Sequence, residues 1–339
     1  MASSSKLKIG VIGLGIGMAH LRELSGINDV EVVAVCDFNE ALLKEAKVLA
    51  PGAIASTNAA DLVKSNKIDA LVIASFDNHH AEQTITALKS GKHVFVEKPL
   101  CLNNDELTSI VKAYNQCSGL LSSNLILRTN PRFIELKSRV AKNELGDLFN
   151  IESGYWWGRI QKLREGWRGQ IENYSVTLGG GVHMIDLSKW LMGSRILEVS
   201  AVGVKKASKD FYFKTPDTVI SQFVFENGAI GRMTANCGCV HPHFHEFNVF
   251  GTNGTFLNRE DGGHYFFSSE QTKPTICATQ YRGTNKAALL NQFIRAIVDG
   301  SPLLIPTQNV FDCISACLAI DQSIILGSKV KVNYIEAQR

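Results

Sequence analysis

A glycine-rich turn between a short strand and a helix is the feature that most constrains how this chain folds. Gly13 to Gly17 reads Gly-Leu-Gly-Ile-Gly and follows the mostly apolar segment Lys8–Ile12. In such a turn the first glycine permits a tight bend, and the second lets the backbone approach a phosphate closely. The next segment, from about Met18 to Ser25, has helical spacing, and a helix N-terminus offers N–H groups that bind anions. The sequence therefore predicts an α/β domain that opens on a phosphate-binding turn.

An acidic residue at the end of the next strand points to a dinucleotide as the ligand. The β-branched segment Val30–Cys36 is followed by Asp37, roughly twenty residues after the turn, where a carboxylate binds ribose hydroxyls. Phe38 and Asn39 come next, so no cation stands where a 2′-phosphate would need one. The sequence favours NAD over NADP, and a purely structural glycine turn is the alternative. The turn residues expected to contact the cofactor are Gly13, Leu14, Gly15, Ile16, Gly17 and Met18, the last standing where a third glycine is usual.

Strands and helices go on alternating as far as about residue 123. The strands are continuous apolar runs, as in a parallel sheet that helices cover on both faces. After the first two, the predicted strands are Asp69–Ala74, His93–Val96 and Leu120–Leu125. The predicted helices are Asn39–Leu49, His80–Ser90 and Asp105–Gln116. We therefore expect a Rossmann-type domain over residues 1–123.

The remainder of the chain, residues 124–339, has a different order of elements. Helices are predicted over Pro131–Asn143 and Gly180–Leu191, with an aromatic strand, Leu148–Trp157, between them. From Ile196 to about Phe267 the chain is a series of β segments joined by glycine-containing turns. Two helices, Lys286–Val298 and Thr307–Leu326, close the chain. This order predicts a second, α+β domain on a largely antiparallel sheet.

A glutamate and a lysine follow the strand His93–Val96, at the edge of a parallel sheet where ligands bind. Pro99 comes directly after Lys98 and fixes the backbone there, and an X–Pro bond can do so in the cis form. A lysine at the cofactor edge can hydrogen-bond a substrate hydroxyl or relay its proton. Glu97 and Lys98 are therefore candidate site residues.

Together these features resemble the Gfo/Idh/MocA family of NAD(P)-dependent oxidoreductases over nearly the whole chain. Besides the glycine turn and Asp37, the resemblance rests on Ala74-Ser75-Phe76-Asp77 with His80, on Gly91 to Pro99, and on Gly179 to Asp186. It implies a Rossmann domain followed by a domain with a large, open sheet. It also implies hydride transfer between NAD(P) and a secondary alcohol or keto group of a sugar, cyclitol or nucleotide-sugar. Assembly into a homodimer or homotetramer through the C-terminal sheet is a further implication.

The same resemblance implies roles for individual residues. Lys98 would contact substrate and nicotinamide, and His183 would be the general acid/base, which suits a side chain that titrates near neutral pH. Asp186 lies three residues after His183 and would bind substrate hydroxyls from the same helix face. Many family members carry an acid four residues before this histidine, where this chain has Gly179, so His183 works without that partner or with another. The remaining expected cofactor contacts are Ser75, His80, Glu97 and Asn124.

Two further groups are candidates for substrate binding. Trp167 and Arg168 end a loop rich in arginine, and they offer a flat ring and a planar fork of donors; a solvated loop is the alternative. His241, His243 and His245 alternate, which would place them on one face of a strand. Because no carboxylate accompanies them at a spacing typical of a metal site, we predict no metal and assign His245 to substrate binding or a subunit interface.

Composition limits the partners of the protein. The net charge is +3 and the basic residues are dispersed, which disfavours a nucleic-acid surface. The N-terminus lacks the apolar core of a signal peptide, and no stretch approaches the roughly 20 apolar residues of a membrane span. We therefore expect a cytoplasmic enzyme with a small-molecule substrate. Two alternatives stay open, namely a non-catalytic dinucleotide sensor of the same fold and NAD-dependent glycoside cleavage with an internal redox cycle.

Overall fold

The computed structural model describes residues 6–277, 279, 281 and 288–338, which form two compact units. The first unit contains Met1–Asn124, Lys286–Phe311 and Ile335–Arg339. The second contains Leu125–Asn285 and Asp312–Tyr334. The chain first leaves the N-terminal unit close to the predicted boundary. The chain then returns to that unit twice. Neither unit is therefore one continuous stretch of the sequence.

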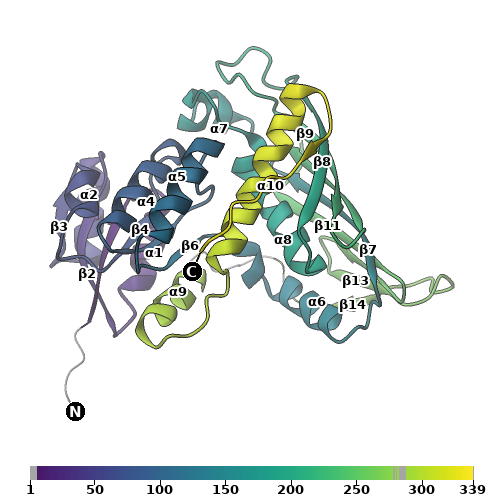
Figure 1. The fold of residues 1–339 in the computed structure, drawn as a ribbon, viewed down its shortest axis with the longest axis horizontal. Helices are drawn as coiled ribbons and strands as arrows, with labels where there is room; N and C mark the ends of the chain where they lie inside the picture. The colour runs from purple at the N-terminus through teal and green to yellow at the C-terminus, as the bar shows by residue number, and fades with distance from the viewer. Residues whose placement is uncertain (1–5, 278, 280, 282–287, 339) are drawn as a thin grey trace. The chain divides into compact units, whose positions relative to one another are not determined.

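The first unit is built on a six-stranded parallel sheet with the order β3-β2-β1-β4-β5-β6, which confirms the predicted Rossmann-type sheet (Figure 1). Its strands are β1 (Leu7–Ile12), β2 (Val30–Cys36), β3 (Ile54–Ser56), β4 (Ala70–Ile73), β5 (His93–Val96) and β6 (Leu121–Ser123). Its helices include α1 (Gly17–Leu24), α2 (Glu40–Leu49), α3 (Ala59–Val63), α4 (His80–Lys89), α5 (Asn104–Asn115) and α9 (Ala288–Val298). The strand order reverses between β1 and β4, and ligands bind at the carboxyl ends of strands at such a point.

Helices α2 and α5 of this unit begin with side-chain caps, and α1 does not. Asn39 accepts a hydrogen bond from the Ala41 N–H at 3.0 Å at the start of α2, and Asn103 accepts one from the Glu106 N–H at 2.9 Å at the start of α5. The N-cap of α1 is Ile16, which has no capping oxygen, and the first turn of α1 holds no acidic residue. The N-terminus of α1 therefore keeps its partial positive charge available to an anion.

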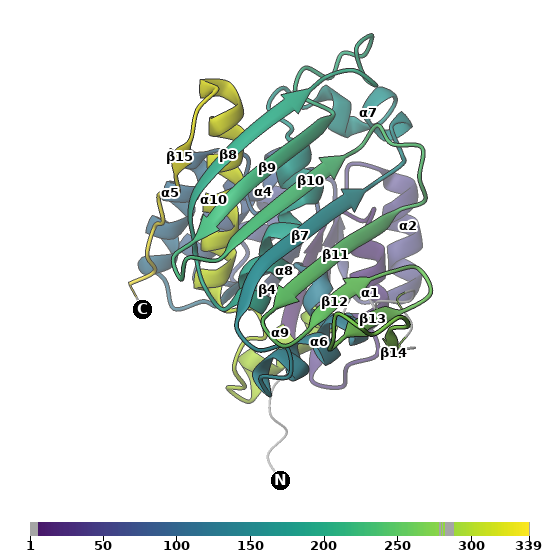
Figure 2. The same ribbon diagram turned by 90° about the vertical axis from the view of Figure 1, so that its right-hand side faces the viewer.

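The second unit is built on a nine-stranded sheet with the order β14-β13-β12-β11-β7-β10-β9-β8-β15 (Figure 2). Its strands are β7 (Leu148–Trp156), β8 (Ile196–Val204), β9 (Thr218–Phe225), β10 (Ile230–Asn236), β11 (Phe244–Gly251), β12 (Thr255–Asn258), β13 (Gly263–Phe266), β14 (Thr275–Cys277) and β15 (Val330–Lys331). Among the described strands, β7 and β10 pair in parallel and the other neighbours pair antiparallel. The predicted α+β domain with a mostly antiparallel sheet is confirmed.

Alternation along the strands gives this sheet two unlike faces. On β7, Ile151, Ser153 and Tyr155 are buried, and Glu152 between them is half-buried and pairs with Arg232 of β10. The helices of this part of the chain are α6 (Pro131–Ala141), α7 (Gln161–Arg164), α8 (Val182–Met192) and α10 (Thr307–Leu326). Figure 2 shows one face of the sheet toward the viewer, with α8 behind it. The buried face therefore packs into the core and, as shown below, contacts the candidate catalytic histidine of α8 through Tyr155.

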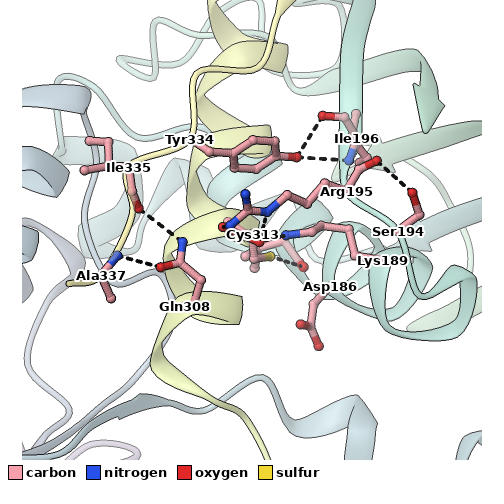
Figure 3. A network of polar contacts seen from close by, with 12 residues as sticks. Asp186, Lys189, Ser194, Arg195, Ile196, Gln308, Cys313, Tyr334, Ile335 and Ala337 are labelled. Carbon is pink, nitrogen blue, oxygen red and sulfur yellow. Dashed lines mark hydrogen bonds and ion pairs between the residues drawn. The ribbon is translucent and has the colours of Figure 1, made fainter. Parts of the chain in front are cut away.

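Helix α10 corrects one expectation, because its 20 residues are long and apolar enough to cross a membrane. About two thirds (67%) of its most apolar stretch is buried inside the structure. Its Asp312 binds Lys189 at 3.3 Å and Arg195 at 2.8 Å. Figure 3 shows the polar network around Lys189 and Arg195. Burial lowers the pKa of Lys189 despite the opposing charge of Asp312. These features are those of a helix that packs in the core of the structure.

Candidate active site

The glycine turn has the geometry that the sequence predicts. Gly13 has a φ of +83°, and a Cβ atom there would lie 2.3 Å from the carbonyl oxygen of Ala74, so only glycine fits. A Cβ atom on Gly15 would have no atom within 4 Å among its surroundings. Gly17 and Met18 are buried as the first residues of α1. Leu14 and Ile16 complete the turn. The open space beside Gly15 and the uncapped start of α1 together suit a pyrophosphate.

Asp37 is fixed against this turn by backbone donors. The Leu14 N–H donates to its Oδ2 at 2.6 Å, and the Asn39 N–H donates to its Oδ1 at 2.8 Å. The carboxylate is buried, and it keeps lone pairs for further donors such as ribose hydroxyls. Beside it, the exposed ring of Phe38 contacts Phe76 at a centroid separation of 5.6 Å. The sequence analysis took Phe38 only as evidence that no cation stands at this position. It did not predict the aromatic pair.

Glu97 is the anchored residue next to Lys98. Its Oε1 receives hydrogen bonds from His20 at 2.8 Å and from Asn124 at 2.7 Å, and all three side chains are buried. Burial acts to raise the pKa of Glu97, but the bonds from His20 and Asn124 and the charge of Lys98 hold it below its usual range. Lys98 is half-buried, and the Lys98–Pro99 bond is cis. The structure thus brings Glu97, Lys98 and Asn124 to one edge of the sheet.

Ser75 and His80 lie one strand away, after β4. The Ser75 hydroxyl donates to Gln83 at 2.7 Å. The buried His80 ring lies between two backbone carbonyls, with Nδ1 2.6 Å from the Pro99 oxygen and Nε2 3.1 Å from the Ser75 oxygen. His80 therefore ties the segment after β4 to the segment after Lys98. Its direct contact with a cofactor stays a prediction.

In the second unit, His183 lies within a cluster of rings. It is buried near the start of α8 and lies roughly parallel to Tyr155 of β7, with centroids 6.3 Å apart and a 29° interplanar angle. His245 of β11 approaches it at 6.2 Å. Tyr155 and His245 are directly opposite each other in the β7–β11 register. His243 and Tyr281 extend the cluster around His245.

This cluster contains two residues that sequence reasoning missed, Tyr155 and Tyr281. Burial raises the pKa of both phenols well above the usual range, so each keeps its hydroxyl proton. The Tyr281 hydroxyl hydrogen-bonds Nδ1 of His245, which fixes that ring. Among the described residues, no group of three or more His, Cys, Asp or Glu side chains could hold a metal ion. Rings and neutral hydroxyls surround His183, which suits a sugar-like ligand.

Asp186 lies on α8, as predicted, and pairs with an arginine. Its two carboxylate oxygens accept hydrogen bonds from Arg128, at 3.0 Å from Nε and 2.6 Å from Nη2. Both side chains are almost completely buried. Asp186 thus holds Arg128, whose guanidinium lies over the ring of Trp190 at 5.7 Å. The binding of substrate hydroxyls by Asp186 stays a prediction.

Trp167 and Arg168 lie in a short 3₁₀ turn, Trp167–Gln170, and both are half-buried. The Arg168 guanidinium lies 4.2 Å from the centroid of the Trp167 ring, so one face of that ring is covered. The charges of Arg168 and Arg159 act to lower the pKa of Tyr155, against the stronger effect of burial. The loop is thus electrostatically coupled to the ring beside His183. Direct contact of Trp167 or Arg168 with substrate stays a prediction.

Comparison with known proteins decides the family. Residues 7–125 match the model of an oxidoreductase family with an NAD-binding Rossmann fold, and residues 133–257 match the GFO/IDH/MocA C-terminal domain. The chain belongs to the Gfo/Idh/MocA family. It is therefore an oxidoreductase with NAD as its cofactor, which confirms both predictions.

The relatives include several dehydrogenases that act on cyclitols or sugars. Myo-inositol 2-dehydrogenase of Thermotoga maritima is 26% identical over 86% of this chain and 84% of its own length. The fold resembles levoglucosan dehydrogenase in complex with NADH, with a TM-score of 0.86, 20% identity and coverage of 98% of this chain and 100% of that one. It also resembles scyllo-inositol dehydrogenase from Lactobacillus casei with NAD(H) and scyllo-inositol, with a TM-score of 0.80, 22% identity and coverage of 97% and 99%.

Proposed function

We propose that this protein transfers a hydride between NAD(H) and a secondary alcohol or keto carbon of a sugar, cyclitol or nucleotide-sugar. The observation that carries the proposal is Lys98 beside the anchored carboxylate of Glu97, at the sheet edge that also holds the open glycine turn and Asp37. A structural Rossmann domain needs no lysine at that place. The relatives named above, which act on inositols, support a polyhydroxylated substrate.

The residues of the first unit fit NAD. The start of α1 and the space beside Gly15 would take the pyrophosphate, and Asp37 would take the ribose hydroxyls. The carboxylate of Asp37 would repel a 2′-phosphate, which supports NAD over NADP. When bound, the nicotinamide supplies the hydride acceptor or donor. Ser75, His80 and Asn124 would complete the binding edge.

The protein's own groups would handle the proton. In the oxidative direction His183 would accept the hydroxyl proton of the substrate, because a neutral imidazole is a base near neutral pH. Lys98 would donate a hydrogen bond to a substrate oxygen and fix its position. His245 would contact a neighbouring hydroxyl, with Trp167 and Arg168 as further contacts. Asp186 would act through Arg128.

The test is a substrate panel. Purified protein and NAD are mixed with individual inositols, aldoses, anhydrosugars and nucleotide-sugars, and NADH formation is followed by absorbance. The proposal predicts turnover with at least one polyol, and a preference for NAD over NADP. NAD binding without turnover in either direction on the whole panel would favour the dinucleotide sensor. Product formation with retained cofactor and no free NADH would favour glycoside cleavage.

We also propose that the outer face of the nine-stranded sheet joins copies of this chain. That face displays Val202, Ile220 and Ile230, which are 68%, 45% and 54% exposed, beside the Glu152–Arg232 ion pair. A sheet face with apolar side chains and paired charges is typical of a subunit interface. Sedimentation should show a dimer or tetramer that Ile220→Lys disrupts and that the surface variant Lys209→Glu leaves intact. A wild-type protein that sediments as a monomer would contradict the proposed assembly.

We also propose that the enzyme is cytoplasmic.

A further inference from the structure

The backbone just before His183 packs against a tyrosine that sequence reasoning did not single out. A Cβ atom built on Gly179 would lie 1.9 Å from the hydroxyl oxygen of Tyr174 and 2.5 Å from its Cζ. The Tyr174 side chain is buried, and its ring contacts Phe213 with centroids 6.0 Å apart. The carbonyl of Tyr174 accepts a hydrogen bond from the Thr215 hydroxyl at 2.6 Å. The phenol is thus held in place, and its hydroxyl fills the space that a side chain at position 179 would occupy.

Helix geometry relates this hydroxyl to His183. Thr177–Gly181 forms a π-helical turn that continues directly into α8, so positions 179 and 183 belong to one helical segment. Residues four apart lie on one helix face with their Cβ atoms about 5–6 Å apart. Because Cα–Cβ bonds tilt toward the helix N-terminus, the His183 side chain leans toward position 179. The Tyr174 hydroxyl therefore lies on the side toward which the imidazole leans.

Other groups also face His183. Tyr155 comes from β7 and His245 from β11, with Tyr281 and His243 around His245. The charges of Arg159 and Arg168 reach Tyr155. A Cβ atom on Gly180 would lie 2.3 Å from Cε1 of Tyr155, so that ring packs against the neighbouring glycine. Tyr174 differs from all of these because it is the hydroxyl, and not a ring edge, that occupies the space beside the glycine.

We propose that Tyr174 is the positioning residue for His183, in the place where an acid at position 179 would otherwise serve. This inference rests on the proposed function of His183 as the base. A neutral imidazole that accepts the substrate proton on one nitrogen carries a hydrogen on the other, and that hydrogen needs an acceptor. The phenol oxygen of Tyr174 is that acceptor. It holds one tautomer and stabilises the imidazolium less than a carboxylate would, because it carries no charge.

The first test needs no enzymatic activity, so its outcome is separate from that of the proposed function. The imidazole signals of His183 are followed by NMR across pH in wild type, Tyr174→Phe and Tyr155→Phe, and are assigned with His183→Ala. We expect Tyr174→Phe to move the titration midpoint of His183 to lower pH by about half a unit or more, because the charged form loses an acceptor. Tyr265→Phe is the matched control, since Tyr265 is a buried tyrosine of β13 whose hydroxyl has no hydrogen-bond partner among the described residues.

An unchanged titration midpoint of His183 in Tyr174→Phe, or a shift found only in Tyr155→Phe, overturns the proposal.

The second test measures turnover and introduces an acid at position 179. Tyr174→Phe should lower kcat by about tenfold with little change in KM, the loss expected for one neutral hydrogen bond, and its pH–rate profile should move to lower pH with His183. Gly179→Asp combined with Tyr174→Ala should recover kcat relative to Tyr174→Ala alone, because the carboxylate takes the vacated space. No recovery in the folded double variant would contradict a shared position.

Discussion

Gly13–Gly17 and Gly179–Gly181 are both glycine runs at the start of a helix, but the space beside their backbones is used in opposite ways. Beside Gly15 no atom lies within 4 Å of a built Cβ, so the first run is open to a ligand at its middle glycine. Beside Gly179 and Gly180 the same space is filled by Tyr174 and Tyr155. A glycine run before a helix can therefore admit a cofactor or the protein's own rings. The sequence around each run does not say which.

The largest expected effect separates catalysis from binding. We expect His183→Ala to lower kcat by about two to four orders of magnitude, because it removes the general base, while NAD affinity stays near that of wild type. Steady-state kinetics and calorimetric NAD titration measure the two quantities. His79→Ala, which changes a histidine outside the ring cluster, is the control. Turnover within a few-fold of wild type in His183→Ala would mean that the second glycine run does not introduce a catalytic residue.

The buried ion pair between Asp186 and Arg128 should contribute to the stability of the fold. Asp186→Asn leaves the buried Arg128 without its counter-charge, and we expect a loss of about 3–5 kcal/mol in the free energy of unfolding. Glu152→Gln, which breaks the partly exposed pair with Arg232, should cost about 1 kcal/mol or less. Urea unfolding of both variants measures the difference. Equal losses would show that Asp186 has a role other than holding Arg128.

Gly180→Ala tests the filled run. Its new Cβ would meet Cε1 of Tyr155 at 2.3 Å, so the ring must move, and overpacking of this kind costs about 1–3 kcal/mol. Thermal and urea unfolding report the loss, and NAD affinity should not change. A variant as stable as wild type would show that the space beside Gly180 is not occupied in solution.

Gly15→Ala tests the open run. We expect it to weaken NAD binding without lowering stability, the opposite of Gly180→Ala. The new methyl meets no protein atom, and the loss of backbone freedom in the unfolded chain should leave the stability equal or higher by about 0.4–1 kcal/mol. NAD should bind about tenfold more weakly, because the backbone can no longer approach the pyrophosphate as closely. Unchanged NAD affinity would contradict the placement of the cofactor at this turn.

The fold of the first unit was largely predictable because its signals are local. The ends of β2 and β5 were predicted as found, since each is an apolar run with a clear stop on both sides. The short elements β3 and α3 were missed, because Ile54–Ser56 and Ala59–Val63 are too brief to show a period. Helix α10 has the predicted ends. The sequence analysis did not predict that this helix is long and apolar enough to span a membrane. The start predicted for α9 lies outside the described residues.

The candidate residues of the two units also differ in how well the sequence predicts their positions. The glycine turn, Asp37 and Glu97–Lys98 follow strands directly, so sequence position was enough to place them on one sheet edge. The rings that contact His183 come from β7 and β11, and only strand register and packing bring them together. The burial of Asp186 could not be predicted either, because its partner Arg128 lies far away in the sequence.

The measurement that tests the account most directly compares turnover and NAD binding in Lys98→Met. Methionine keeps the length and apolar stem of the side chain and removes the ammonium group. We predict that turnover of the best substrate nearly disappears, by about two orders of magnitude or more, while NAD affinity stays within a few-fold of wild type. Turnover near that of wild type would contradict the assignment of Lys98, and with it the claim that the edge beside Glu97 is where the reaction takes place.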